Sequence, residues 1–177
     1  KDDEDVDEKI RRAIKKNEEL SREIEDKIRR ILKKHEDLTR DLAREIREVV
    51  RKLRELSKRG GGKEMADKVL KEAKEVIEKI ERTSRKSLKE VKDLIDRLAE
   101  RSKKSLDELR EVIERLRERG VSEELLRKVE ELLRRLEEEN RKILKEVDER
   151  LKDLEKKDRD LLEEAKKLLE DVERELR

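Results

Sequence analysis

Residues 81–116 read ERTSRKSLKEVKDLIDRLAERSKKSLDELREVIERL, and this stretch repeats its apolar pattern after 18 residues. Ile95 and Ile113 are 18 positions apart, and so are Leu98 and Leu116. Eighteen residues make five turns of an α-helix, so these positions stay on one face of a straight helix, whereas a period of 3.5 residues would impose a supercoil. The stretch therefore predicts a long, nearly straight helix with one apolar face.

The same period runs through the rest of the chain. Apolar residues with this spacing are Ile10, Ile28 and Ile46; Ile14, Leu32 and Val50; Leu70, Leu88 and Leu106; Val129, Val147 and Ala165; and Leu133, Leu151 and Leu169. At 100° per residue each apolar face covers about 120° of the helical wheel, which is typical of a helix that faces the core of a small bundle.

Glycines divide this pattern into three segments. Gly60, Gly61, Gly62 and Gly120 are the only glycines, and there is no proline. We expect one helical-bundle domain over residues 1–177, with helices at about 2–58, 63–119 and 122–177 and loops at 59–62 and 120–121. Loops this short make neighbouring helices antiparallel. The predicted fold is an all-α, nearly straight, up-down-up antiparallel three-helix bundle.

The residues around the second loop have the chemistry of helix ends. Gly120 suits the left-handed position that follows a helix, and Ser122 suits the N-cap of the next one. Val121 and Leu126 have the spacing of a hydrophobic staple, in which an apolar residue before the cap packs on one in the first turn.

Composition excludes several classes of function. Charged residues make up 60% of the 177 residues, the net charge is +2, and aromatic residues and cysteine are absent. Without cysteine there is no disulfide or thiolate metal site, and no apolar run reaches the roughly 20 residues that span a bilayer. The acidic start KDDEDVDEK is unlike a signal peptide, and interspersed charges with near-zero balance argue against a nucleic-acid partner. We expect a soluble protein that needs no cofactor, metal or membrane.

Polar residues interrupt the apolar faces with the same 18-residue spacing. When the chain is folded at its two loops, they fall into two layers, each with members from all three helices. The first layer contains Asn17, Ser21, Ser102, Ser105 and Asn140, and the second contains His35, Thr39, Thr83, Ser84, Ser87 and Asp158. A buried polar group costs about 1–3 kcal/mol unless it is paired. We therefore expect hydrogen-bonded layers that fix the register of otherwise interchangeable aliphatic repeats.

The second layer also has the residue types of other chemistries. His35, Asp158 and either Ser84 or Ser87 could form a hydrolase triad, but regular helices supply no oxyanion hole and a closed bundle has no pocket. A metal site would need a further strong ligand beside His35 and Asp158. A structural network is the favoured interpretation. The pH dependence of stability stays open. If His35 is a cation held by Asp158, stability is lost as pH rises; if the imidazole is buried neutral, stability is lost as pH falls.

The repeated segments KSLKEVKDLIDRL and KSLDELREVIERL, the GGG loop, the GVSEE helix start and the two polar layers resemble de novo designed three-helix bundles with buried hydrogen-bond networks. The resemblance covers the whole chain, and it implies a hyperstable structural scaffold with no evolved activity. The alternative is an interaction module, in which the apolar faces bind a fourth helix or a second copy of the chain.

Overall fold

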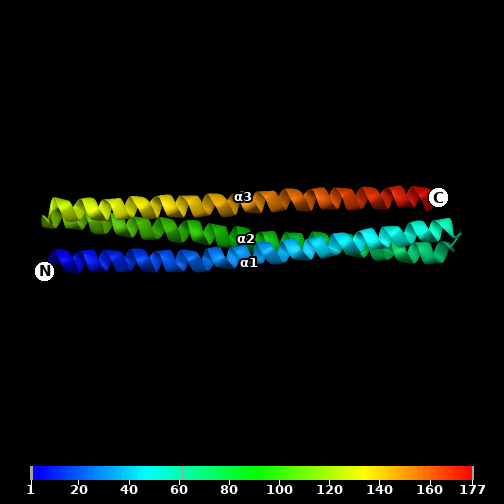
Figure 1. Cartoon of the computed structure of the whole chain (residues 1–177), viewed down its shortest axis with the longest axis horizontal. Coiled ribbons are helices and arrows are strands. Elements are labelled where there is room, and N and C mark those ends of the chain that lie inside the picture. Colours follow the sequence, from blue (N-terminus) through cyan, green and yellow to red (C-terminus); the bar gives the residue numbers. More distant parts are fainter. Residues whose placement is uncertain (1, 61, 177) are drawn as a thin grey trace. The chain divides into compact units, whose positions relative to one another are not determined.

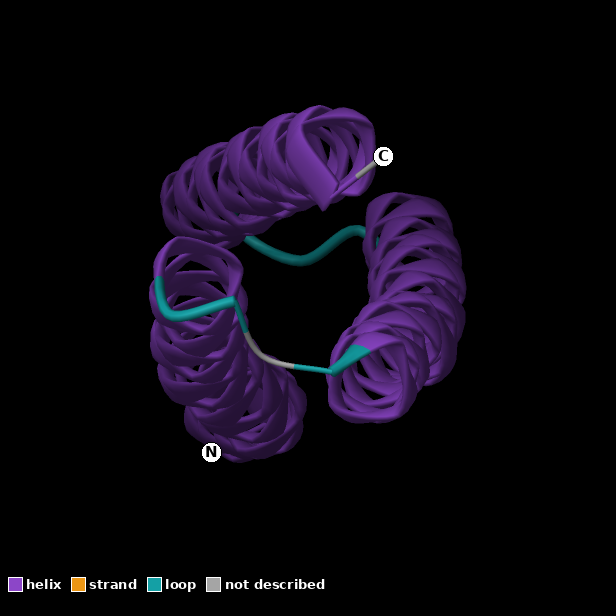
Figure 2. Cartoon of the chain, turned by 90° about the vertical axis from the view of Figure 1, so that its right-hand side faces the viewer, coloured by secondary structure: helices purple, strands orange, loops and turns teal. Residues whose placement is uncertain are grey.

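A computed structural model describes residues 2–60 and 62–176 of the chain; Gly61, in the predicted first loop, lies outside the described residues together with residues 1 and 177. The chain forms three α-helices, α1 (Asp2–Lys58), α2 (Lys63–Arg119) and α3 (Glu123–Leu176) (Figure 1). Two short loops join them, and the described ranges contain no strand (Figure 2). The prediction of an all-α three-helix bundle is confirmed.

Local sequence explains why the helices persist over so many turns. Most positions carry glutamate, lysine, arginine or leucine, which lose little side-chain freedom in a helix. Oppositely charged residues four positions apart also pair along the surface, as Arg11 does with Asp7 at 3.1 Å and Arg12 with Glu8 at 2.8 Å. Each such pair adds only about 0.2–0.5 kcal/mol, so the buried faces supply most of the stability.

The helix ends at the second loop follow from backbone hydrogen bonding. Gly120 has a φ of 73°, the left-handed conformation that favours glycine. Its amide donates to the carbonyl of Arg117 at 3.2 Å, and the amide of Val121 donates to the carbonyl of Leu116 at 3.4 Å. These two bonds form a Schellman motif, which satisfies carbonyls that the helix itself leaves free. Gly60, with a φ of 67°, takes the same left-handed conformation after α1.

Ser122 caps the start of α3. Its Oγ accepts a hydrogen bond from the amide of Leu125 at 3.3 Å, the bond that defines a serine N-cap. Val121 and Leu126, on either side of this cap, both pack against the same apolar core cluster. The loop is thereby anchored by one polar and one apolar interaction.

The chain divides into two compact units, and each contains one segment of every helix. Unit 1 comprises Lys1–Arg29 with Lys92–Arg150, and unit 2 comprises Arg30–Val91 with Leu151–Arg177. The expectation of a single domain over 1–177 stays a prediction.

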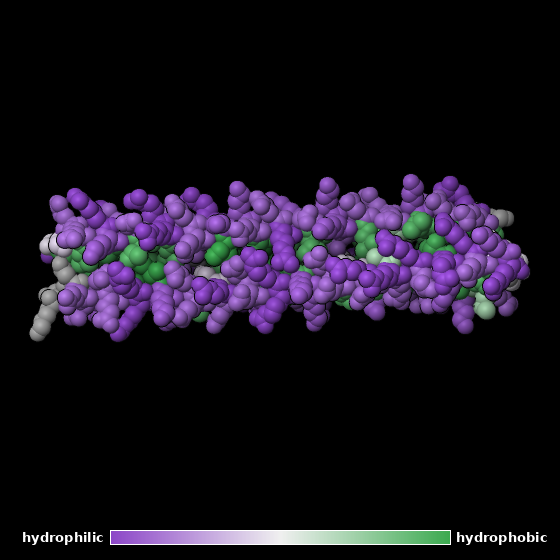
Figure 3. Space-filling view, viewed as in Figure 1, coloured by the Kyte–Doolittle hydropathy of each residue, from purple (hydrophilic) through white to green (hydrophobic). Residues whose placement is uncertain are grey.

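Each unit has its own aliphatic core. In unit 1 the core residues are Ile10, Ile14, Leu109, Ile113, Leu116, Leu125, Val129, Leu133 and Leu136. In unit 2 they are Leu42, Ile46, Val49, Val50, Leu53, Ala73, Val76, Ile77, Ile80, Ala165, Leu169 and Val172. Hydrophilic residues cover the face seen in Figure 3, and apolar residues show only between them. The 18-residue series supplies most of the unit 1 core and part of the unit 2 core, and Leu70, Leu88, Ile95 and Leu106 are only half-buried.

Candidate functional site

Polar side chains are buried in both units. Among the described residues they are Asn17, Ser21, His35, Thr39, Ser84, Ser102, Asn140 and Asp158. All eight are among the eleven residues that the sequence predicts for the two layers, and the other three, Thr83, Ser87 and Ser105, are half-buried.

The first polar cluster lies in unit 1. It consists of Asn17 and Ser21 from α1, Ser102 and Ser105 from α2, and Asn140 from α3. In the described part of the chain no hydrogen bond joins its members, and four buried atoms have no partner: both amide atoms of Asn17, Ser21 Oγ and Asn140 Nδ2. The structure therefore places these polar groups on all three helices of one unit, without the hydrogen bonds of the layer that the sequence predicts.

The second polar cluster lies in unit 2. It consists of His35 and Thr39 from α1, Thr83, Ser84 and Ser87 from α2, and Asp158 from α3. The Nε2 of His35 lies 2.6 Å from the Oδ2 of Asp158, a hydrogen-bonding distance between two buried side chains on different helices. Thr39 Oγ1 instead donates to the carbonyl of Glu36 on its own helix at 3.0 Å. One cross-helix bond is thus present where a wider network was predicted.

Two buried atoms of the second cluster have no partner within the described ranges. They are His35 Nδ1 and Ser84 Oγ. The hydroxyl of Ser84 is therefore not hydrogen-bonded to the imidazole of His35. No group of three or more histidine, cysteine, aspartate or glutamate side chains in the described structure is placed to hold a metal ion.

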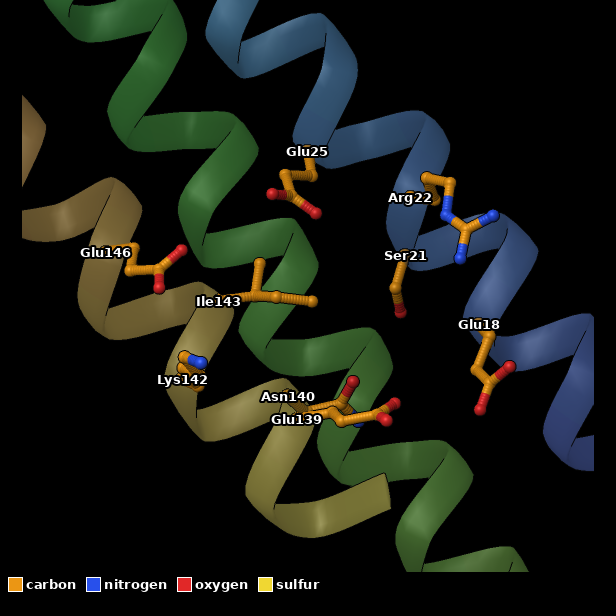
Figure 4. A pocket seen from close by; sticks show the side chains of 9 residues that line it. All are labelled: Glu18, Ser21, Arg22, Glu25, Glu139, Asn140, Lys142, Ile143 and Glu146. Carbon is orange, nitrogen blue, oxygen red and sulfur yellow. The ribbon is translucent and has the colours of Figure 1, made fainter. Parts of the chain in front are cut away.

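A pocket of about 400 Å³ opens beside the first polar cluster, between α1 and α3 (Figure 4). Ser21 and Asn140 lie at its inner side, and Ile143 supplies an apolar contact. Its remaining lining is charged: Glu18, Arg22, Glu25, Glu139, Lys142 and Glu146. Sequence spacing does not predict this pocket, and its one available signal is the small side chain of Ser21 on the buried face of α1.

Ion pairs between helices lie at the surface of each unit. Arg29 of α1 reaches Glu146 of α3 at 3.5 Å while it also pairs with Glu25 at 2.8 Å. In unit 2, Lys166 of α3 reaches Glu81 of α2 at 3.0 Å. Exposed pairs of this kind contribute about 0–1 kcal/mol each, so they orient neighbouring helices more than they stabilise them.

Glu48 and Arg51, on the exposed face of α1, shift each other's pKa. Arg51 lies 2.6 Å from Glu48 and 2.9 Å from Glu55. The hydrogen bond and positive charge of Arg51 lower the pKa of Glu48. The hydrogen bond and charge of Glu48, with the charge of Glu55, raise the pKa of Arg51. This cluster lies apart from both polar clusters, on a solvated face.

None of the three helices, over the residues described, has a segment apolar enough to cross a membrane. No family model matches the sequence, and no curated protein matches it either. A solved structure described as a "Computationally designed three helix bundle" is similar to the chain, with 23% sequence identity and a TM-score of 0.42 over 98% of this chain and 83% of that one.

Proposed function

We propose that the chain is a structural scaffold of the designed type that its sequence resembles, without a natural biochemical activity. Its two polar clusters act as register determinants. The observation that carries this proposal is the burial, in each unit, of polar side chains from α1, α2 and α3 within an otherwise aliphatic core. Repeated aliphatic faces alone discriminate poorly between alternative packings.

The register role follows from the cost of misplaced polar groups. A side chain such as Asn140 or His35 that moved against an aliphatic layer would be buried without any polar neighbour, at a cost of about 1–3 kcal/mol. Polar residues that pack at one level of the bundle can pair with one another instead, as His35 of α1 does with Asp158 of α3. A buried polar residue fixes the register of coiled coils by the same principle.

The proposal is tested by replacing one whole polar cluster. In the test variant the first cluster, Asn17, Ser21, Ser102, Ser105 and Asn140, is changed to leucine, isoleucine or valine. We expect its free energy of unfolding to equal or exceed that of the parent, because the unpaired polar groups are gone. We also expect loss of a unique structure, seen as more than one amide signal per residue in NMR spectra or as mixed oligomers in light scattering.

A matched control separates register from general repacking. Changing the same number of core residues that lie away from the polar clusters, within the aliphatic cores and between leucine and isoleucine, preserves patterning and should leave one set of signals. If the cluster variant also keeps one set of signals and one mass, the polar residues do not specify register and the proposal is wrong.

The alternative function, a module that binds a fourth helix or a second copy of the chain, makes a different prediction. The parent chain would then associate in solution, or capture an added amphipathic helix, through its helix faces.

The scaffold proposal also implies high stability. We expect the midpoint of unfolding to lie above about 5 M guanidinium chloride.

A further inference from the structure

The pocket between α1 and α3 has a buried polar wall whose hydrogen-bonding groups are unused. Ser21 is 2% exposed and Asn140 is 6% exposed, and both point toward the same space in Figure 4. Neither Ser21 Oγ nor Asn140 Nδ2 has a hydrogen-bond partner among the described residues. This wall offers both donors and acceptors to a ligand.

The chemistry of that wall selects a neutral group at its contact point. A primary carboxamide carries one strong acceptor and one donor group, so it matches an amide nitrogen and a hydroxyl at the same time. A charged group in the same position would lose its hydration without a buried counter-charge. The pocket volume of about 400 Å³ lies within the range of small-molecule sites, about 300–1,000 Å³.

The mouth of the pocket favours a positively charged group, unlike the inner wall. Four carboxylates line it against two cations, Arg22 and Lys142, which leaves an excess of negative charge. Arg29 pairs with two of the carboxylates, Glu25 and Glu146. The other two, Glu18 and Glu139, have no ion-pair partner in the described part of the chain. A cation at the mouth is attracted to them while it keeps most of its water.

We propose that this pocket binds small molecules in which a primary carboxamide adjoins an ammonium group, the class of α-amino amides. The carboxamide contacts Ser21 and Asn140, and the ammonium group lies toward Glu18 and Glu139. Ile143 contacts a short aliphatic substituent. This binding is independent of the register role of the cluster, because it uses hydrogen-bonding capacity that the packed helices leave free.

The sequence provides an unusually direct assay. Asn17 and Asn140 are the only carboxamide side chains in the chain, which contains no glutamine. The side-chain amide region of a ¹⁵N-correlated NMR spectrum therefore holds two pairs of signals, one of them from the proposed site. The probe is alaninamide, titrated into the full chain. Propanamide lacks the ammonium group, and alanine lacks the carboxamide.

We expect the Asn140 side-chain signals to shift saturably with alaninamide. Propanamide should bind about threefold to fivefold more weakly, the effect of losing one exposed charge interaction, and alanine should give no saturable shift. The double variant Glu18→Gln with Glu139→Gln should bind alaninamide and propanamide equally. Absence of a saturable shift with alaninamide, which would mean that water alone fills the pocket, overturns the proposal.

Variants of the wall test the contact itself. Ser21→Ala should weaken binding about fivefold, the effect of one lost hydrogen bond, and Ser21→Thr, which keeps the hydroxyl, should restore most of it. Ser105→Ala is the matched control, since Ser105 belongs to the same cluster but does not line the pocket. Circular dichroism confirms that each variant is folded. Equal weakening by Ser21→Ala and Ser105→Ala would mean that the cluster, and not the pocket, controls the shift, and would overturn the assignment.

Discussion

Replacing Asp158 by alanine leaves a buried imidazole without a partner. His35 is 2% exposed and Asp158 is 4% exposed, and the 2.6 Å contact between them is the one hydrogen bond of the imidazole among the described residues. His35 Nδ1 is already unpartnered. Asp158→Ala therefore leaves both ring nitrogens buried and unpaired. The expected loss is about 1–3 kcal/mol of unfolding free energy for the newly orphaned nitrogen.

A surface aspartate on the same helix provides the control. Asp153 of α3 pairs with Lys157 at 3.4 Å, and its side chain is 65% exposed. Alanine forms helix better than aspartate by a few tenths of a kcal/mol, a gain that both variants share. The difference between Asp158→Ala and Asp153→Ala therefore isolates burial and pairing.

Circular dichroism in guanidinium chloride is the appropriate assay, because the chain has no aromatic residue to serve as a fluorescence probe. A double variant, His35→Leu with Asp158→Leu, should recover the lost stability or exceed it, because no polar group then stays unpaired. If Asp158→Ala costs no more than Asp153→Ala, the pair contributes nothing to stability and the reasoning fails.

Three further changes test the core, a turn and a surface ion pair. Ile80→Ala, at a fully buried position, should cost about 2–5 kcal/mol in denaturant melts; a cost below 1 kcal/mol would contradict tight packing there. Gly120→Ala should cost about 1–2 kcal/mol because the φ of 73° is left-handed, whereas Gly62→Ala, with no positive φ and open space around it, should be neutral or slightly stabilising. Because Arg51 lowers the pKa of Glu48, the small stabilisation from this exposed pair is present above the ordinary carboxyl pKa and is lost as pH falls through the lowered one. Glu48→Gln should therefore reduce stability slightly at neutral pH and not in acid, and an equal effect at both pH values would exclude the linkage.

The helices could be predicted because their signals are local and repeated. A period of 18 residues in five turns leaves one consistent face, and glycine at positions such as Gly120 ends a helix for steric reasons that need no tertiary information. The membership of the polar clusters follows from the same period. Residues 18 positions apart are five full turns apart, so they lie on the same face of the helix.

The hydrogen bonds within the clusters could not be predicted. The 18-residue period determines on which face of a helix a residue lies. The hydrogen bonds of a serine or asparagine depend on its rotamer, which varies with the local distance between helices. Thr39 illustrates this, because its hydroxyl bonds to a carbonyl of its own helix instead of a neighbouring helix. Such local bonds compete with cross-helix partners for every serine and threonine in a helix.

The pocket beside Ser21 escaped prediction for a related reason. Where a large aliphatic residue would fill the space between α1 and α3, Ser21 leaves it open, and the surrounding charged residues read as an ordinary solvated face. Sequence spacing shows that Glu18 and Glu139 flank the apolar stripe, but it does not show that they face each other across a gap.

In the proposed scaffold, the three helices of one chain are complete without a further helix. Sedimentation equilibrium over a wide range of protein concentration distinguishes this scaffold from a module that associates. We expect a constant mass of 21.4 kDa, that of one chain. A mass that rises with concentration toward twice this value would contradict it, and would show that the helix faces serve association between chains.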